Sequence, residues 1–251
     1  MERLEKALDV LEIFLQHEGE LRISQLASLS GLNVSTAYRL ASTLVKRGYL
    51  SRQQKRGKYS LGLKLLGFSS AIKKKVKVRD AALPFLEKLN AATGEAVNLA
   101  ILDSSEAVYI EHLESHSYLL RMFTEVGNRV SLHCTGVGKT FLANMREEEL
   151  QRYLNCYGLP QCTSKTITDT GKLKNELLIA KRDGIAEDDE ETELGVRCIA
   201  SPVKDGNGNV VAAVSISGPS ARLNSDRVRE LKLLVKNCGL EISQAIGYRG
   251  E

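Results

Sequence analysis

Most side chains that could bind a ligand in the first third of this chain are cationic. Between Leu21 and Arg79 the sequence has 14 Lys or Arg residues and no Asp or Glu. A run of one charge sign repels itself, and a polyanion is the partner that relieves the repulsion. The charge pattern therefore predicts a module that binds nucleic acid.

The polar residues after Asn33 indicate how that module would read a duplex. Asn33 can cap a helix over 34–47, with hydroxyl groups near its start and basic residues near its end. Such a face fits a major groove, because small side chains permit close approach and Arg39 can reach guanine O6 and N7. The predicted DNA contacts in and before this helix are Ser24, Ser35, Thr36, Tyr38, Arg39, Thr43 and Lys46.

A basic hairpin is predicted next. Residues 48–52 and 58–61 alternate in polarity on either side of a polar tip that contains Gly57, as in the wing of a winged helix-turn-helix. Its cations would lie along backbone phosphates, which position a protein without reading sequence. These cations are Arg52, Lys55, Arg56 and Lys58. A solvated helical bundle with basic faces is the structural alternative.

Two motifs in the rest of the chain could indicate catalysis or metal binding, and both are incomplete. Residues 136–140 read GVGKT, but the phosphate-binding pattern GxxxxGK[ST] needs a glycine where the chain has His133. His133, Cys134, Asp188 and Cys198 could bind zinc, but they lack the short spacing of a zinc motif. We therefore expect no metal, no cofactor and no enzymatic activity, with zinc at those four residues as the alternative.

Charge and composition divide the chain into two parts. Residues 1–79 carry a net charge of +10 and the remainder −6, so one module suits an anion and the other is an ordinary acidic domain. The N-terminus is charged, no run approaches the ~20 apolar residues of a membrane span, and the five cysteines have no CxxC spacing. These features predict a cytoplasmic protein with free thiols.

The elements that would position these residues form two domains and a connecting helix. We predict a winged helix-turn-helix DNA-binding domain at 1–62, a linker helix at 63–78 and an effector-binding domain at 79–251. Ser24 is the expected cap of a short helix over 25–29, and Val34 is expected on the buried face of the third helix. The apolar stripe of the first helix would be Leu4, Ala7, Leu8, Leu11, Phe14 and Leu15.

The second domain is predicted to be α+β, with helices flanking an antiparallel sheet. The expected helices cover residues 79–93, 135–144, 147–155, 170–182 and 225–246. The expected strands cover residues 96–102, 107–113, 118–123, 185–188, 198–203 and 210–216.

This order of parts, together with three motifs, resembles the IclR family of bacterial transcriptional regulators. The motifs are LHCTGVGKTFLA at 132–143, DDEETELGVRCIA at 188–200 and VSISGP at 214–219. The resemblance implies a winged helix-turn-helix that binds operator DNA and a GAF-like domain that binds a small effector, often an organic acid. It further implies a dimer or tetramer that regulates transcription, with repression as the expected sign.

The resemblance also implies a set of effector-binding residues. Backbone N–H groups of Gly136 and Val137, at the start of a helix, would face a carboxylate. Asp188 would accept from a ligand hydroxyl, and two serines spaced by two would donate. The set is Leu119, Met122, Val130, Gly136, Val137, Asp188, Cys198, Ser215 and Ser217. Val137 replaces the Ala that is usual in members binding very small acids, so the acid stays open. The functional alternative is an enzyme that turns over a small acid.

Overall fold

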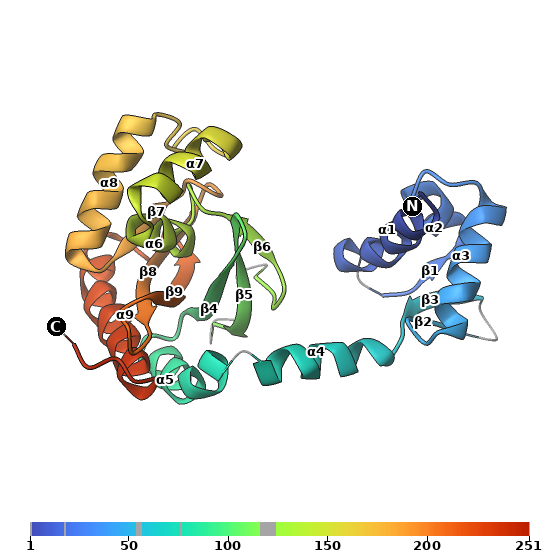
Figure 1. Ribbon diagram of the computed structural model, residues 1–251, viewed down its shortest axis with the longest axis horizontal. Helices are drawn as coiled ribbons and strands as arrows, with labels where there is room; N and C mark the ends of the chain where they lie inside the picture. Colours follow the sequence, from blue (N-terminus) through green and yellow to red (C-terminus); the bar gives the residue numbers. More distant parts are fainter. Residues whose placement is uncertain (1, 18, 54–56, 76, 116–123, 251) are drawn as a thin grey trace. The chain divides into compact units, whose positions relative to one another are not determined.

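In the computed structural model (Figure 1), the described residues are 2–17, 19–53, 57–75, 77–115 and 124–250. The chain divides into two compact units, Met1–Val76 and Lys77–Glu251. None of the described helices has the length and apolar character needed to span a membrane.

The N-terminal unit is a winged helix-turn-helix. Its elements are α1 (Glu2–Gln16), β1 (Leu21–Arg22), α2 (Ile23–Leu29), α3 (Val34–Lys46), β2 (Leu50–Arg52), β3 (Lys58–Leu61) and α4 (Lys64–Lys75). The strands form an antiparallel sheet in the order β1-β3-β2, which pairs Leu21 with Tyr59 and Leu50 with Leu61. Tyr59 and Leu50 are almost fully buried, so the hairpin is anchored to the same core as the helices.

Three details of this unit differ from the sequence-based prediction. Ser24 does not cap α2: the helix starts at Ile23, and the backbone N–H of Arg22 donates to Gln25 Oε1 at 2.9 Å. Val10 and Phe14 form the buried side of α1, whereas Leu4, Leu8 and Leu15 are exposed. Val34 is 52% exposed. It is the first residue of α3, and the buried residues of this helix, Ala37 and Ala41, come later.

The C-terminal unit is an α+β domain. Its helices are α5 (Lys77–Thr93), α6 (Gly136–Asn144), α7 (Glu147–Tyr157), α8 (Thr170–Asp183) and α9 (Ser225–Ala245). Its strands are β4 (Ala96–Asp103), β5 (Glu106–Leu113), β6 (Arg129–Ser131), β7 (Ala186–Asp189), β8 (Val196–Lys204) and β9 (Val210–Pro219). Within the described residues these strands form one antiparallel sheet in the order β6-β5-β4-β9-β8-β7. The predicted strand at 118–123 lies outside the described residues, and β6 was not predicted.

Alternation along the strands separates the two faces of this sheet. Ala100, Ala213, Ala200 and Ala186 pack in one apolar cluster with residues of α6, α7 and α8. On the opposite face α9 lies close to β8, where a Cβ on Gly239 would lie 2.8 Å from the Pro202 carbonyl oxygen. The small alanines allow α6 to approach the sheet closely, and this places the start of α6 over β8.

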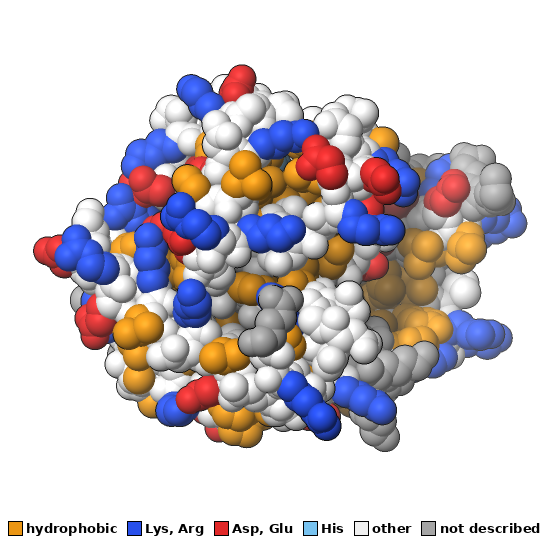
Figure 2. All heavy atoms as spheres, turned by 60° about the vertical axis from the view of Figure 1, so that its left-hand side comes forward, with side chains coloured by type: hydrophobic (Ala, Val, Ile, Leu, Met, Phe, Trp, Pro, Cys, Tyr) orange, Lys and Arg blue, Asp and Glu red, His pale blue; other side chains and the backbone are white. Residues whose placement is uncertain are grey.

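The net negative charge of this unit is not spread evenly over its surface. On the face shown in Figure 2, Lys and Arg side chains clearly outnumber Asp and Glu side chains. Two of its acidic residues, Glu176 and Glu191, form ion pairs with the buried Lys139 described below.

Candidate functional sites

Helix α3 presents the predicted DNA-reading residues on the side opposite its buried residues. Asn33 caps the helix by accepting from the Thr36 N–H at 2.8 Å, and Ala37 and Ala41 are fully buried. Helical geometry places Ser35, Arg39, Thr43 and Lys46 on one outward face, and all four are exposed. Thr36 is half-buried beside them, and Ser24 is exposed on α2. The exposed face can enter a groove without disturbing the core.

The wing and α3 are joined through Arg52. Its guanidinium lies 5.8 Å from the Tyr38 ring centre and 5.5 Å from the Tyr59 ring centre, distances at which a cation is attracted to an aromatic face. Tyr38 therefore packs against the wing. Lys58 is 3.8 Å from Glu20, a weak half-exposed ion pair that phosphate can compete for. Lys55 and Arg56 lie outside the described residues.

The sheet register brings the predicted effector residues of three strands together. Ser217 pairs with Cys198, and Cys198 pairs with Asp188, so the three side chains form one row across β9, β8 and β7. Ser215 lies in the next row, opposite Ala200. All four predicted residues are buried on the face that α6 covers, and this is where an enclosed ligand would meet polar groups.

The N-terminus of α6 lies directly over this row. Thr135 caps the helix by accepting from the Gly138 N–H at 3.1 Å. A Cβ on Gly136 would lie 3.1 Å from Cys198 Sγ, and one on Gly138 would lie 2.3 Å from Leu132 Cα. Glycine at 136 lets the positive end of the helix reach the sheet, and glycine at 138 leaves room for the turn at Leu132 that precedes the helix. Val137 is fully buried in the apolar cluster, so its side chain is part of the core, and only its backbone can face a ligand.

Asn98 completes the polar group, and it was not predicted from the sequence. Its Nδ2 donates to Ser215 Oγ at 3.3 Å and to Ser217 Oγ at 3.2 Å. Its Oδ1 accepts from His112 Nδ1 at 2.7 Å. Because both serines accept from Asn98, their own hydroxyl protons can be donated elsewhere. Asn98 interrupts the apolar run AVNLAIL, and this is the sequence signal that could have identified it as a buried polar residue.

Burial sets the protonation of the groups around Asn98. Burial lowers the pKa of His112 although neighbouring carboxylates oppose this, which favours the neutral ring that donates to Asn98. Burial raises the pKa of the Cys198 thiol to about 11, so this thiol is neutral at physiological pH. Burial, and then Cys198 and Asp188, raise the pKa of Tyr109, a second residue that the sequence did not indicate.

Asp188 has a structural partner already. Its Oδ1 accepts from the Glu191 N–H at 2.7 Å and from the Thr192 N–H at 3.4 Å. Burial raises its pKa, and these hydrogen bonds oppose the rise. Asp188 therefore orders the loop between β7 and β8 as well as lining the site.

Lys139 is the lysine of the GVGKT segment, which resembles part of a phosphate-binding loop. Its side chain is fully buried, forms ion pairs with Glu176 and Glu191, and donates to the Glu187 carbonyl at 2.8 Å. Burial alone would lower its pKa, but the two carboxylates outweigh burial and raise it. The ammonium group thus neutralises internal acids and does not face a ligand.

A cavity of about 600 Å³ opens beside strand β7, between α8 and α9, and its lining includes the predicted effector residues Asp188 and Cys198. Its charged lining residues are mostly paired: Arg197 is 2.5 Å from Asp189, and Lys232 is 2.5 Å from Glu187. Because these charges already satisfy one another, the cavity offers less to a small anion than the Asn98 and serine group does.

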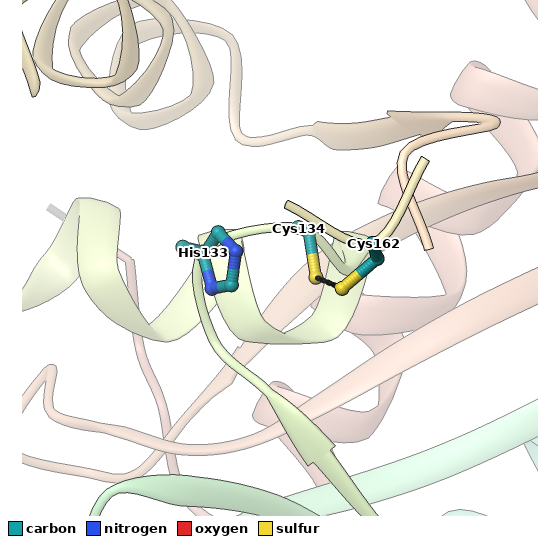
Figure 3. A group of neighbouring side chains, drawn as sticks. All are labelled: His133, Cys134 and Cys162. Atoms are coloured by element: carbon teal, nitrogen blue, oxygen red, sulfur yellow. Dashed lines mark hydrogen bonds between the residues drawn. The ribbon is translucent and has the colours of Figure 1, made fainter. Parts of the chain in front are cut away.

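The remaining predicted residues fall into three groups. Val130 lies on β6, opposite Ala107, and packs against the apolar cluster. Leu119 and Met122 lie outside the described residues. Of the four residues considered for zinc, the structure groups His133 and Cys134 with Cys162, and neither Asp188 nor Cys198 belongs to that group (Figure 3).

Two family descriptions match this chain. The bacterial transcriptional regulator IclR C-terminal family matches residues 70–244, and the IclR helix-turn-helix domain matches residues 3–54. The chain is 33% identical over 248 residues to the HTH-type transcriptional regulator XynR of Escherichia coli K12, covering 99% of this chain and 98% of XynR. It is 32% identical over 249 residues to the transcriptional repressor IclR of the same strain, covering 98% of this chain and 90% of that repressor.

Solved structures agree with the sequence matches. The crystal structure of Thermotoga maritima IclR has a TM-score of 0.85 and 34% identity, covering 99% of this chain and all 100% of that one. An IclR homologue from Microbacterium hydrocarbonoxydans, complexed with 4-hydroxybenzoate, has a TM-score of 0.83 and 26% identity. The match covers 97% of this chain and 98% of that one.

Proposed function

Because this chain belongs to the IclR family of bacterial transcriptional regulators, we propose that it is a cytoplasmic repressor whose C-terminal unit senses a small organic acid. Family membership confirms the expected fold and a regulator of transcription instead of an enzyme. The acid, its binding residues, the sign of regulation and the oligomeric state belong to the proposal.

The buried polar group around Asn98 carries the effector part of this proposal. Ser215 and Ser217 accept from Asn98, so their hydroxyl protons are available to the oxygens of a carboxylate. The N-terminus of α6, at Gly136, adds a positive dipole end on the same side. Val130, Leu119 and Met122 would supply an apolar wall, which fits an acid with a hydrocarbon or aromatic body.

The relative from Microbacterium supports this ligand class. That homologue is complexed with 4-hydroxybenzoate, which combines a carboxylate, an aromatic ring and a hydroxyl. In this chain Asp188 and the serines would meet the polar ends of such a molecule. Tyr109, a buried residue of the apolar cluster that contains Ala200, would limit its length.

The DNA part of the proposal assigns base reading to α3 and phosphate contacts to the wing. Arg39 would contact guanine, while Lys46, Arg52, Arg56 and Lys58 would lie along the backbone. Two chains in a dimer would place two α3 helices in successive major grooves about 34 Å apart, on a near-palindromic operator. Assembly of dimers into a tetramer would allow two operators to be held together.

Binding of the acid would favour one arrangement of the assembly and thereby release the operator. Coupling between such sites is typically about 1–3 kcal/mol, a change of roughly 5- to 150-fold in affinity. The test selects operator duplexes from a random pool with the purified protein and then titrates 4-hydroxybenzoate, keto acids and sugar acids into the complex. Release by one acid at a concentration that also raises the melting temperature of the free protein is expected. Conversion of that acid into a product would contradict a regulator without activity.

A further inference from the structure

Three thiol and imidazole groups meet at the start of α6, away from the serine and asparagine group. His133 and Cys134 precede the helix, and Cys162 comes from the segment between α7 and α8. One ligand atom from each residue lies within 4.8 Å of the others, and Cys134 Sγ is 3.9 Å from Cys162 Sγ (Figure 3). Residues far apart in sequence thus place two sulfurs and an imidazole around one point.

The sulfur separation matches an edge of a tetrahedral metal site. Two thiolates about 2.3 Å from a tetrahedral Zn²⁺ lie roughly 3.8 Å apart. A disulfide needs about 2.05 Å between the sulfurs, so the observed 3.9 Å would require the two segments to move toward each other. A weak hydrogen bond between thiols fits the distance, but it gives no role to the histidine.

The imidazole has one ring nitrogen without a hydrogen-bond partner among the described residues. His133 Nε2 lies 2.9 Å from the Pro160 carbonyl, and because a carbonyl only accepts, Nε2 carries the proton. Nδ1 then holds a free lone pair, and it is buried without a hydrogen-bond partner in the described part of the chain, in a side chain that is 1% exposed. Metal-bound histidines commonly donate their other ring N–H to a backbone carbonyl in this way.

The segments that carry the three residues are held in place by other hydrogen bonds. Thr166 Oγ1 accepts from the Cys162 N–H at 3.0 Å and donates to the Glu191 carbonyl at 2.6 Å. Thr192 Oγ1 donates to the Cys134 carbonyl at 2.9 Å. The loop after β7 therefore fixes both cysteine backbones, and a site needs little rearrangement to close.

We propose that His133, Cys134 and Cys162 bind a thiophilic divalent cation, with Zn²⁺ the best match to two thiolates and one imidazole. Both thiols release their protons to solvent on binding. Water takes the fourth position on the side where Cys162 is exposed. The cation ties the segment between α7 and α8 to the start of α6, next to Gly136.

The test uses the full chain, reduced with a phosphine and stripped of metal, and compares Cys162→Ser with Cys156→Ser. Both cysteines are exposed, and Cys156 lies on α7 outside the group, so it controls for loss of a surface thiol. Zinc is titrated against a chromophoric chelator, Co²⁺ is used as a spectroscopic probe, and circular dichroism checks folding.

Wild type and Cys156→Ser are expected to bind one Zn²⁺ per chain and to show a thiolate-to-cobalt charge-transfer band with tetrahedral d–d bands. Loss of a ligand should weaken zinc binding by at least about 100-fold in Cys162→Ser. Equal zinc affinity in the two variants overturns the assignment. So does a reduced wild type without the cobalt band, or recovery of a Cys134–Cys162 disulfide from a chain that binds no zinc.

Discussion

His112 Nδ1 lies 2.7 Å from Asn98 Oδ1, and this hydrogen bond fixes the orientation of the amide. With Oδ1 accepting from His112, Nδ2 must point to Ser215 and Ser217. The serine hydroxyls accept from Asn98 and keep their own protons free to donate. One histidine on β5 therefore determines the donor pattern on β9, two strands away.

Ser217→Ala removes one proposed donor to the carboxylate. Hydrogen bonds to a charged group are worth about 1.5–3 kcal/mol, so the affinity for the acid found in the screen should fall by roughly 10- to 150-fold. Calorimetric titration measures this, and operator binding by the ligand-free variant should equal that of wild type. Ser220→Ala, just beyond β9, is the control, and an equal loss there would place the ligand elsewhere.

His112 should make stability depend on pH in one direction. Its pKa is lowered in the folded protein, so the unfolded chain binds the proton more readily. The stability that the neutral ring provides is therefore complete above the unfolded pKa of about 6.5 and is lost as pH falls from there through the folded pKa.

Urea unfolding between pH 5 and 8 tests this in wild type and His112→Gln. The variant should have a slope of unfolding free energy against pH that is shallower by up to about 1.4 kcal/mol per pH unit below pH 6.5. His17→Gln, at an exposed position after α1, is the control for replacing a histidine. Parallel curves for wild type and His112→Gln would show that the ring does not change protonation on folding.

Arg39 and Lys46 should contribute differently to DNA binding although both are exposed on one face of α3. Arg39→Ala should relax the preference for one base by about 1–3 kcal/mol while nonspecific binding remains. Lys46→Ala should weaken binding to all duplexes alike and reduce the salt slope by about one. Competition binding at several salt concentrations distinguishes the two effects. An unchanged base preference in Arg39→Ala would contradict the assignment of base reading to α3.

Lys139→Met should destabilise the C-terminal unit strongly. It leaves the Glu176 and Glu191 carboxylates without their buried cation, and breaking a buried pair costs about 3–5 kcal/mol. Thermal or urea unfolding measures the loss. Lys181→Met, at an exposed position on α8, should change stability by less than about 0.5 kcal/mol. A small effect in Lys139→Met would mean that water reaches the ion pair.

Periodicity and caps were enough to predict most elements of both units. The cap at Asn33 is local, because its side chain accepts from the backbone three residues on, and the sequence predicted it. Thr135, which was expected as the first residue of its helix, is the cap of α6. The apolar stripe of α1 was predicted less well, since Leu4, Leu8 and Leu15 share the spacing of core residues but are exposed. Periodicity cannot distinguish a face that meets the core from one that faces solvent.

The sites were harder to predict because they depend on strand order. Cys198, Ser217 and Asp188 come together only through the β7–β8–β9 register, and the family motifs indicated them where spacing could not. Asn98 joins them from β4 because β4 pairs with β9. Cys162 replaces Asp188 and Cys198 beside His133 and Cys134 because the segment after α7 returns to the start of α6, and no local pattern shows this.

Operator affinity with and without the effector acid, in wild type and in Asn98→Ala, tests the central claim most directly. Asn98→Ala removes the amide that orients both serines but leaves α3 and the wing intact. The acid should weaken operator binding by wild type by roughly 5- to 150-fold and leave binding by Asn98→Ala unchanged at the same concentration. An Asn98→Ala protein that stays folded and responds to the acid like wild type would contradict the account.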